Sequence, residues 1–348
     1  MVAFLFYLPF LLVFVIFAVY AERKVSAFMQ DRLGPMVVGK YGLLQTLADV
    51  LKMMQKEDII SFNADKILFI LAPLIIFVSI FTGFAVLPLS EGVTGSEAET
   101  GIYFLMAVIS LDVIGILMAG WGSNSKFSIF GALRSVAQIV SYEIPMGLCI
   151  LCVVMLSQSL SLQEISIQQT VSLSGWNEGW TGIGAWYIVK YPFLIVVFVI
   201  YFISSLAESN RTPFDLPESE SELIGGFHTE YSGFRWAVIM LAEYGMMLLT
   251  ALVAVIMFFG SWNTFLPNVG LMKLADWTSG SSGTLSAQLW GGFWLISKAM
   301  LIVFVQMWVR WTYPRVRVDQ MMKLSWKYLT PISLLMVFLS GIWKLWIG

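Results

Sequence analysis

Long apolar runs constrain this chain more than any other feature of its sequence. A helix that crosses the ~30 Å hydrocarbon core of a bilayer needs about 20 mostly apolar residues, and lipid offers no partner for an unpaired backbone amide. Eight stretches of suitable length occur, at 2–21, 66–88, 101–120, 132–157, 186–207, 235–260, 289–309 and 328–347. Only 12% of the residues are charged, about half the share of a soluble domain. We therefore expect an all-α integral membrane protein, with residues 1–348 forming a single polytopic domain of eight transmembrane helices.

The distribution of basic residues predicts the orientation of these helices. Most of the 20 Lys and Arg residues fall in four alternate loops, at 21–65, 121–135, 207–235 and 310–327. Loops rich in Lys and Arg remain on the cytoplasmic side of the membrane. We therefore expect these four loops to be cytoplasmic. Both termini then lie outside, as do the loops 89–101, 158–185 and 275–286.

Composition also excludes several kinds of site. The net charge of −2 gives no basic excess, so nucleic-acid binding is not expected. The two cysteines, Cys149 and Cys152, lie inside an apolar run and are too few for a disulfide framework or a four-thiolate iron–sulfur cluster. The single histidine, His228, cannot build a zinc site alone. No bound metal is expected.

The first cytoplasmic loop contains a segment with helical periodicity. In the segment 41–59, apolar residues recur at the spacing of one helix face, namely Leu43, Leu44, Leu47, Val50, Leu51 and Met54. This pattern is typical of a short amphipathic helix lying at the membrane interface. Periodicity alone leaves open whether the helix is functional or only links two spans.

Carboxylates gather in the third cytoplasmic loop and inside the spans. The segment 206–231, which we call the acidic loop, carries six acidic residues and a single arginine, Arg211. Neighbouring carboxylates cannot all ionise easily, so some pKa values should rise and the cluster could hold and pass protons. Three further acids, Asp112, Glu143 and Glu243, fall within predicted spans, where an ionisable group is a functional candidate. Each lies roughly 12–17 Å from the cytoplasmic end at 1.5 Å per residue, which suggests one buried polar layer.

Five polar segments, in order along the chain, carry a resemblance to a known family. They are AERKVSAFMQDRLGP, YGLLQTLADVLKMMQKEDI, GWGSNSKFSIFGALRSVAQIVSYEIP, LAESNRTPFDLPESESEL with GGFHTEY, and WVRWTYPRVRVDQMMKLSWK. Together they closely resemble the quinone-site membrane subunit of NADH:quinone oxidoreductase (respiratory complex I). The departures are few: Met36 stands where Asn is expected and Thr46 where Pro is common. Asp112 lies outside the family pattern, so its candidacy rests on depth alone.

The resemblance implies a function that composition could not show. Members of this family dock a peripheral arm on their cytoplasmic face and form the membrane end of a chamber for ubiquinone or menaquinone. Electrons come from an iron–sulfur cluster in a partner subunit, so no flavin, cluster or metal is expected in this chain. Quinone reduction then drives proton translocation toward antiporter-like partner subunits. The implied location is the bacterial inner membrane, with quinone, lipid and the other complex I subunits as partners.

The family's functional residues can be carried over one by one. Those that match the quinone chamber are Glu22, Arg23, Arg32, Asp49, Lys52, Arg211, Asp215, Glu218, Glu220, Glu222, Glu230, Arg310, Arg315 and Arg317. Those that match the proton path are Glu143, Glu208 and Glu243, to which depth adds Asp112. Arg and Lys can stabilise an anionic reduced quinone, and carboxylates with raised pKa can change protonation near neutral pH.

Two other functions fit part of this pattern. A secondary ion transporter would also bury acids near mid-membrane, but it predicts internal repeats and broken helices. The homologous subunit of a membrane-bound hydrogenase or a ferredoxin-linked complex is closer, and the YPRVRVDQ segment at 313–320 favours the quinone enzyme.

Overall fold

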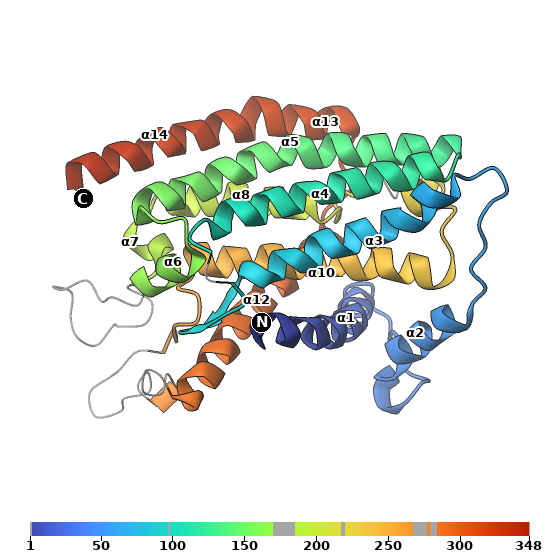
Figure 1. The fold of residues 1–348 in the computed structure, drawn as a ribbon, viewed down its shortest axis with the longest axis horizontal. Helices are drawn as coiled ribbons and strands as arrows, with labels where there is room; N and C mark the ends of the chain where they lie inside the picture. Colours follow the sequence, from blue (N-terminus) through green and yellow to red (C-terminus); the bar gives the residue numbers. More distant parts are fainter. Residues whose placement is uncertain are drawn as a thin grey trace.

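Most helices of the protein run side by side along one long axis (Figure 1). The computed structural model describes residues 2–96, 98–169, 185–216, 220–266, 277–278 and 284–347. Within these ranges the only sheet is a two-stranded antiparallel hairpin, β1 (Pro88–Ser90) with β2 (Val93–Thr94). The predicted helical fold class is confirmed.

Among the residues that the structure describes, six helical segments are long and apolar enough to cross a membrane. The first joins α3 (Lys66–Gly83) to the 3₁₀ helix η2 (Phe84–Val86). The next four are α4 (Gly101–Gly122), α5 (Lys126–Ser157), α10 (Gly233–Phe258) and α12 (Leu285–Thr312). The last runs through α13 (Val318–Lys323), a π-helical segment η4 (Leu324–Leu329) and α14 (Thr330–Ile347). All six fall on predicted spans.

The other two predicted spans differ in form. Helix α1 (Val2–Met29) has 28 residues, or ~42 Å at 1.5 Å per residue. The predicted span 186–207 is not one helix, because it divides into α7 (Tyr187–Lys190) and the shorter apolar helix α8 (Leu194–Glu208). Pro192 lies in the break, and a proline has no amide hydrogen to continue a helix.

Two predicted cytoplasmic loops are largely helical. Helix α5 begins at Lys126, so only residues 123–125 separate it from α4, and residues 126–135 belong to the helix rather than to a loop. Similarly, α13 and the π-helical segment occupy most of 310–327. The polar residues here resemble a loop in sequence, but they form hydrogen bonds to other parts of the protein, as described below.

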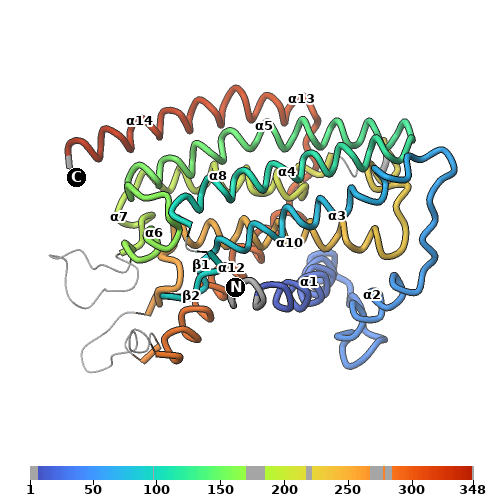
Figure 2. The backbone as a smooth tube through the Cα atoms, in the orientation of Figure 1, coloured from blue at the N-terminus to red at the C-terminus, as the bar shows by residue number. Residues whose placement is uncertain are grey.

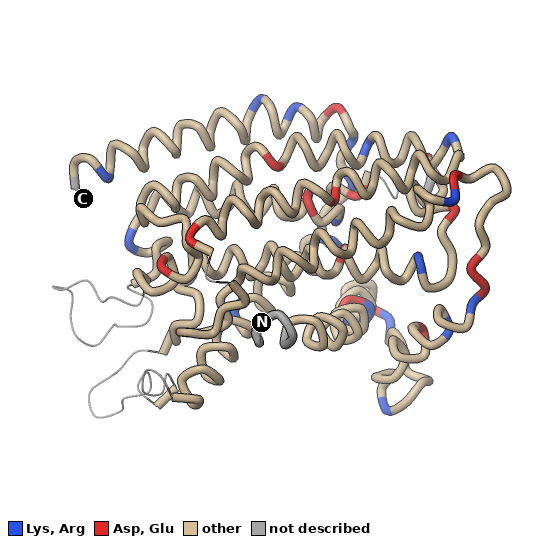
Figure 3. The backbone as a smooth tube through the Cα atoms, viewed as in Figure 1, with Lys and Arg blue, Asp and Glu red and all other residues tan. Residues whose placement is uncertain are grey.

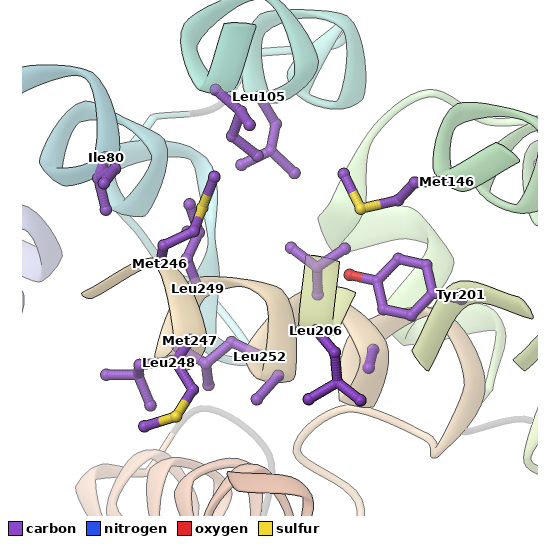
Figure 4. Packing of buried hydrophobic residues seen from close by; sticks show 14 of the residues in the cluster. Ile80, Leu105, Met146, Tyr201, Leu206, Met246, Met247, Leu248, Leu249 and Leu252 are labelled. Atoms are coloured by element: carbon purple, nitrogen blue, oxygen red, sulfur yellow. The ribbon is translucent and has the colours of Figure 1, made fainter. Parts of the chain in front are cut away.

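Helix α10 forms the centre of the core. Every residue from Tyr244 to Phe258 is buried, and α10 packs against α1, α3, α8 and α12. Figure 4 shows Met246, Leu249 and Leu252 of this helix among side chains contributed by α3, α4, α5 and α8. A helical segment that is apolar on all sides is expected to be buried on all sides, and the part of α10 from Tyr244 to Phe258 fits that rule.

Charged residues concentrate at one end of the bundle, which we call the charged end (Figure 3). The 3₁₀ helix η1 (Lys40–Gly42) and the predicted amphipathic helix, α2 (Gln45–Gln55), lie there. In Figure 2, α2 lies at the edge of the bundle, where it contacts α1 and α10. The predicted apolar face is exposed in this chain: Leu47, Val50, Leu51 and Met54 lie on α2, and Leu43 and Leu44 lie just before it.

The opposite end carries the β-hairpin and α6 (Leu162–Gln168). Here the buried Lys298 ammonium donates to the backbone oxygens of Phe259, Ser261 and Asn263 at 2.6–2.9 Å. These carbonyls follow the last turn of α10, where backbone acceptors lack helical partners. The predicted outer loops 158–185 and 275–286 lie partly outside the described residues.

Candidate functional site

A buried carboxylate binds two arginines at the charged end. Glu22, on α1, is 5% exposed. Arg211 donates from one nitrogen to both Glu22 oxygens at 3.1 Å, and Arg310 of α12 also donates to Glu22. The Tyr244 hydroxyl of α10 donates to Glu22 at 2.5 Å. Three predicted chamber residues from distant segments thus form one network, which we call the Glu22 cluster, and Tyr244 completes it.

Arg211 is the more buried of the two cations in this cluster, with its side chain 7% exposed. Its guanidinium lies 4.2 Å from the centre of the Tyr244 ring, a cation–π contact. Burial opposes the charge, but the Glu22 carboxylate outweighs it and raises the pKa of Arg211 above its usual range. The guanidinium also interacts electrostatically with Glu243. Arg211 therefore remains charged and connects Glu22 to the acids inside the bundle.

Three of those acids line one small cavity. Asp112 of α4, Glu208 at the end of α8 and Glu243 of α10 surround a space of ≈ 10 Å³, about the room of one water molecule. Among the described residues, both oxygens of Glu208 and the Oδ1 atom of Asp112 are buried without a hydrogen-bond partner. Buried polar atoms are normally paired. These oxygens would be paired if a carboxyl carried a proton or if a water molecule occupied the cavity.

Glu143 lies beside this cavity rather than in it. Its carboxylate on α5 accepts a hydrogen bond from Ser110 of α4. Glu208 interacts electrostatically with both Glu143 and Asp112. Glu208 therefore interacts with two of the three acids predicted to form a buried layer, and it shares the small cavity with the third, Glu243.

A second, larger cavity opens between α1, α2 and α10. It has a volume of ≈ 400 Å³ and is lined by Arg23, Asp49, Lys52, Met53, Lys56, Tyr231, Ser232, Gly233 and Trp236. An ion pair of 2.6 Å between Arg23 and Asp49 ties α2 to α1. Arg235, at the start of α10, pairs with Asp58 at 2.9 Å and so holds the segment after α2. Of the predicted chamber residues, Arg23, Asp49 and Lys52 meet here.

Carboxylates of the acidic loop pair with arginines from different parts of the chain. Asp215 pairs with Arg315 at 3.2 Å, and the backbone amide of Val316 donates to the oxygen of Pro213 at 3.1 Å. The acidic loop thus contacts the last basic loop. Nearer its end, Glu222 pairs with Arg134 of α5 at 2.5 Å.

Other predicted chamber residues do not join these clusters. Glu230 and Arg317 are exposed, and Arg32 is exposed with a hydrogen bond to Gln30. Glu220 begins the short helix α9 (Glu220–Leu223), and Glu218 lies outside the described residues.

His228 lies in the 3₁₀ helix η3 (Gly226–His228), near the end of the acidic loop. Burial lowers the pKa of His228 to about 4, against the opposing effect of Asp215. In the part of the chain that the structure describes, its Nδ1 atom is buried without a hydrogen-bond partner. The imidazole is therefore neutral near pH 7. The same described residues contain no group of three His, Cys, Asp or Glu side chains placed to hold a metal ion.

Sequence comparison places these features in a family context. Residues 2–341 match the family model described as NADH dehydrogenase. An NADH-quinone oxidoreductase H subunit of Cytophaga hutchinsonii, the one numbered 2, is 55% identical to this chain over 98% of each sequence. The H subunit of Chlorobium luteolum is 50% identical over 95% of this chain and 85% of its own. That of Bacteroides fragilis is 46% identical over 92% of this chain and 83% of its own.

Proposed function

The chain belongs to the NADH dehydrogenase family, and from that premise we propose that it forms the membrane side of a quinone site and links quinone reduction to proton translocation. It is a membrane subunit of an NADH-quinone oxidoreductase, and so it works together with the other subunits of that complex. The relatives named above are all quinone oxidoreductase subunits, which favours quinone over hydrogen as the substrate.

The observation that carries this proposal is the continuity of charged groups from the Glu22 cluster into the bundle. Arg310 and Arg211 bind Glu22, and Arg211 in turn interacts with Glu243, which lines the small cavity with Glu208. A change of charge near the cluster alters the electrostatic field at each following group, because charges interact strongly where little water screens them. Quinone reduction near the cluster would thus change how strongly the buried carboxyl groups hold their protons.

The larger cavity provides a place for the quinone to approach. Its basic side chains, Arg23 and Lys52, suit a headgroup that gains negative charge, and Tyr231 and Trp236 offer aromatic surface. The exposed apolar face of α2 would lie at the membrane interface beside this opening. Reduction takes two electrons from a partner subunit and two protons, and it converts quinone to quinol. This chain would bind the quinone and supply protons.

The proposal includes a topology. All eight predicted helices cross the bacterial inner membrane, with the charged end in the cytoplasm and both termini outside. The concentration of Lys and Arg at the charged end supports this orientation.

The experiment that tests the proposal replaces glutamates of the proton path by glutamine, which keeps the shape of the side chain but cannot carry a proton. In the whole complex, Glu143→Gln and Glu243→Gln should allow assembly but strongly lower proton pumping coupled to quinone reduction, because glutamine cannot carry a proton. Glu→Asp at either position should be milder. Asp112→Asn should also reduce turnover if Asp112 shares the path.

Reconstituted vesicles, driven by NADH and quinone, provide the measurement. Glu99→Gln is a matched control, because Glu99 is exposed at the opposite end of the bundle. Full coupling in both the Glu143 and Glu243 glutamine variants would reject the proton path. A complex driven by hydrogen instead of NADH would reject the quinone enzyme itself.

A further inference from the structure

The last turn of α8 places two of the charged groups. The amide of Arg211 donates to the Leu206 oxygen at 3.0 Å, and the amide of Asn210 donates to the Ala207 oxygen at 3.2 Å. Asn210 has φ = 48°, in the left-handed region that asparagine tolerates better than most residues. These two bonds and this conformation make a Schellman motif, which ends the helix and turns the chain sharply.

Two charged side chains lie on either side of this turn. Glu208 lies just before it and lines the small cavity, whereas Arg211 lies just after it and binds Glu22. Any displacement of the turn therefore moves both side chains together. The two clusters of the proposed site depend on the position of these few residues.

A glutamine on α5 holds the turn from outside α8. The Gln138 amide nitrogen donates to the Ala207 oxygen at 2.7 Å and to Asn210 Oδ1 at 3.2 Å. Ser135, one turn earlier on α5, donates to the same Asn210 oxygen at 3.4 Å. Gln138, Ser135 and Ala207 are fully buried, so water cannot replace these bonds.

Gln138 donates two hydrogen bonds at this position, one to Ala207 and one to Asn210. A backbone oxygen such as that of Ala207 can only accept, so the nitrogen rather than the oxygen of the Gln138 amide must face it. That nitrogen carries two hydrogens, one for each partner. An apolar side chain would leave the Ala207 oxygen, near the end of α8, buried without the partner that Gln138 gives it.

We propose that Gln138 is a positioning residue: it fixes the α8 turn so that Glu208 faces the small cavity while Arg211 reaches Glu22. This inference rests on the proposed function. Gln138 is not among the residues that line either cavity, and it acts only through the turn. Because α5 also carries Glu143, the same helix then sets the distance between Glu143 and Glu208.

The test uses Gln138→Met in the whole complex, because methionine nearly matches glutamine in shape but forms no comparable hydrogen bond. The assembled variant should reduce a soluble dye at the normal rate, since that electron path does not reach this chain. Its kcat with quinone should fall about tenfold or more, as expected for misplaced reacting groups, with a smaller change in KM. Gln138→Glu should regain part of its turnover as the pH is lowered, because only the protonated carboxyl can donate to Ala207, and it donates that one hydrogen bond.

The matched control is Gln169→Met. Gln169 is also fully buried, and it donates to the Ile256 oxygen at 2.7 Å and accepts from Gly260 at 2.9 Å, but it lies at the opposite end of the bundle. This control should keep normal quinone kcat in the assembled complex.

The outcomes distinguish failure of the Gln138 positioning role from failure of the proposed proton path. Quinone turnover of Gln138→Met within about twofold of the wild type would overturn the positioning role, as would failure of both Gln138 variants to assemble while Gln169→Met assembles. If Glu208→Gln is impaired in the same preparation, the proposed proton path survives that failure. If Glu208→Gln retains full coupling, the proton path itself is rejected.

Discussion

Removal of Arg211 should destabilise the protein more than removal of Arg310, although both bind the same carboxylate. The Arg211 side chain is 7% exposed and the Arg310 side chain 26% exposed. Breaking a buried ion pair by removing one partner costs about 3–5 kcal/mol. Arg211→Met leaves Glu22 with Arg310 and Tyr244, so we expect the lower end, about 3 kcal/mol. That is a factor of roughly 150 in the folded-to-unfolded ratio.

Substitutions of the other charged members of the Glu22 cluster should destabilise the protein to different degrees. Arg310→Met should cost about 1.5 kcal/mol, the low end for a hydrogen bond to a charged group, because water reaches this side chain. Glu22→Gln should cost most, about 5 kcal/mol, since two neighbouring guanidinium groups then lose their shared counter-charge. The expected order of destabilisation is therefore Glu22→Gln, then Arg211→Met, then Arg310→Met.

The assay is the half-life of the assembled complex at a fixed elevated temperature in lipid nanodiscs, followed by retention of this chain. Arg235→Met is a control, because that side chain binds the exposed Asp58 rather than a member of the Glu22 cluster. The reasoning is refuted if Arg310→Met shortens the half-life more than Arg211→Met, or if Glu22→Gln is the mildest of the three.

Topology, helix packing and pH dependence each give a further prediction. For topology, Glu91→Cys should react with an impermeant thiol reagent in intact cells and Gln55→Cys only after permeabilisation, and the reverse pattern would invert the proposed orientation. Gly131→Ala brings a Cβ to 2.7 Å from backbone atoms of the acidic loop and should cost about 1–3 kcal/mol, whereas Gly147→Ala on the same helix meets only a methionine tip at 3.7 Å and should be near neutral in a thermal melt. The pKa of His228 is lowered to about 4 by burial, below its unfolded value of about 6.5, so protonation favours unfolding and stability should fall as the pH drops from 6.5 toward 4. His228→Phe should reduce that loss in acid melts; an unchanged acid profile would contradict a buried neutral imidazole.

Much of the fold could be predicted because the length of an apolar run directly indicates a transmembrane helix. The runs at 66–88 and 235–260 predicted α3 and α10, since lipid demands helices of that length. The break between α7 and α8 was missed, because the apolar residues around Pro192 keep the whole run hydrophobic enough to read as one span. The start of α5 was missed for a different reason. Its polar residues resemble a loop, yet Ser128 donates to the Phe227 oxygen at 2.9 Å inside the protein.

The candidate site was predicted in part. Glu22, Arg211 and Arg310 were all carried over from the family resemblance, and the structure brings them together, while their roles with quinone remain predictions. Tyr244 and Gln138 were missed. A tyrosine or glutamine inside an apolar helix gives no periodic signal, and its partner lies in a distant segment of the chain. The family resemblance itself is confirmed by relatives that match nearly the whole chain.

The burial of Tyr244–Phe258 of α10 on all sides has a consequence for how the chain assembles in the membrane. On insertion, α10 is surrounded by lipid, and its final neighbours come from both earlier and later parts of the chain, α1, α3 and α8 before it and α12 after it. Apolar side chains gain no hydrophobic free energy when they exchange lipid for protein, so close van der Waals packing must drive the step. Enclosure of α10 must therefore wait until α12 has been synthesised, and the order of assembly differs from the order of synthesis.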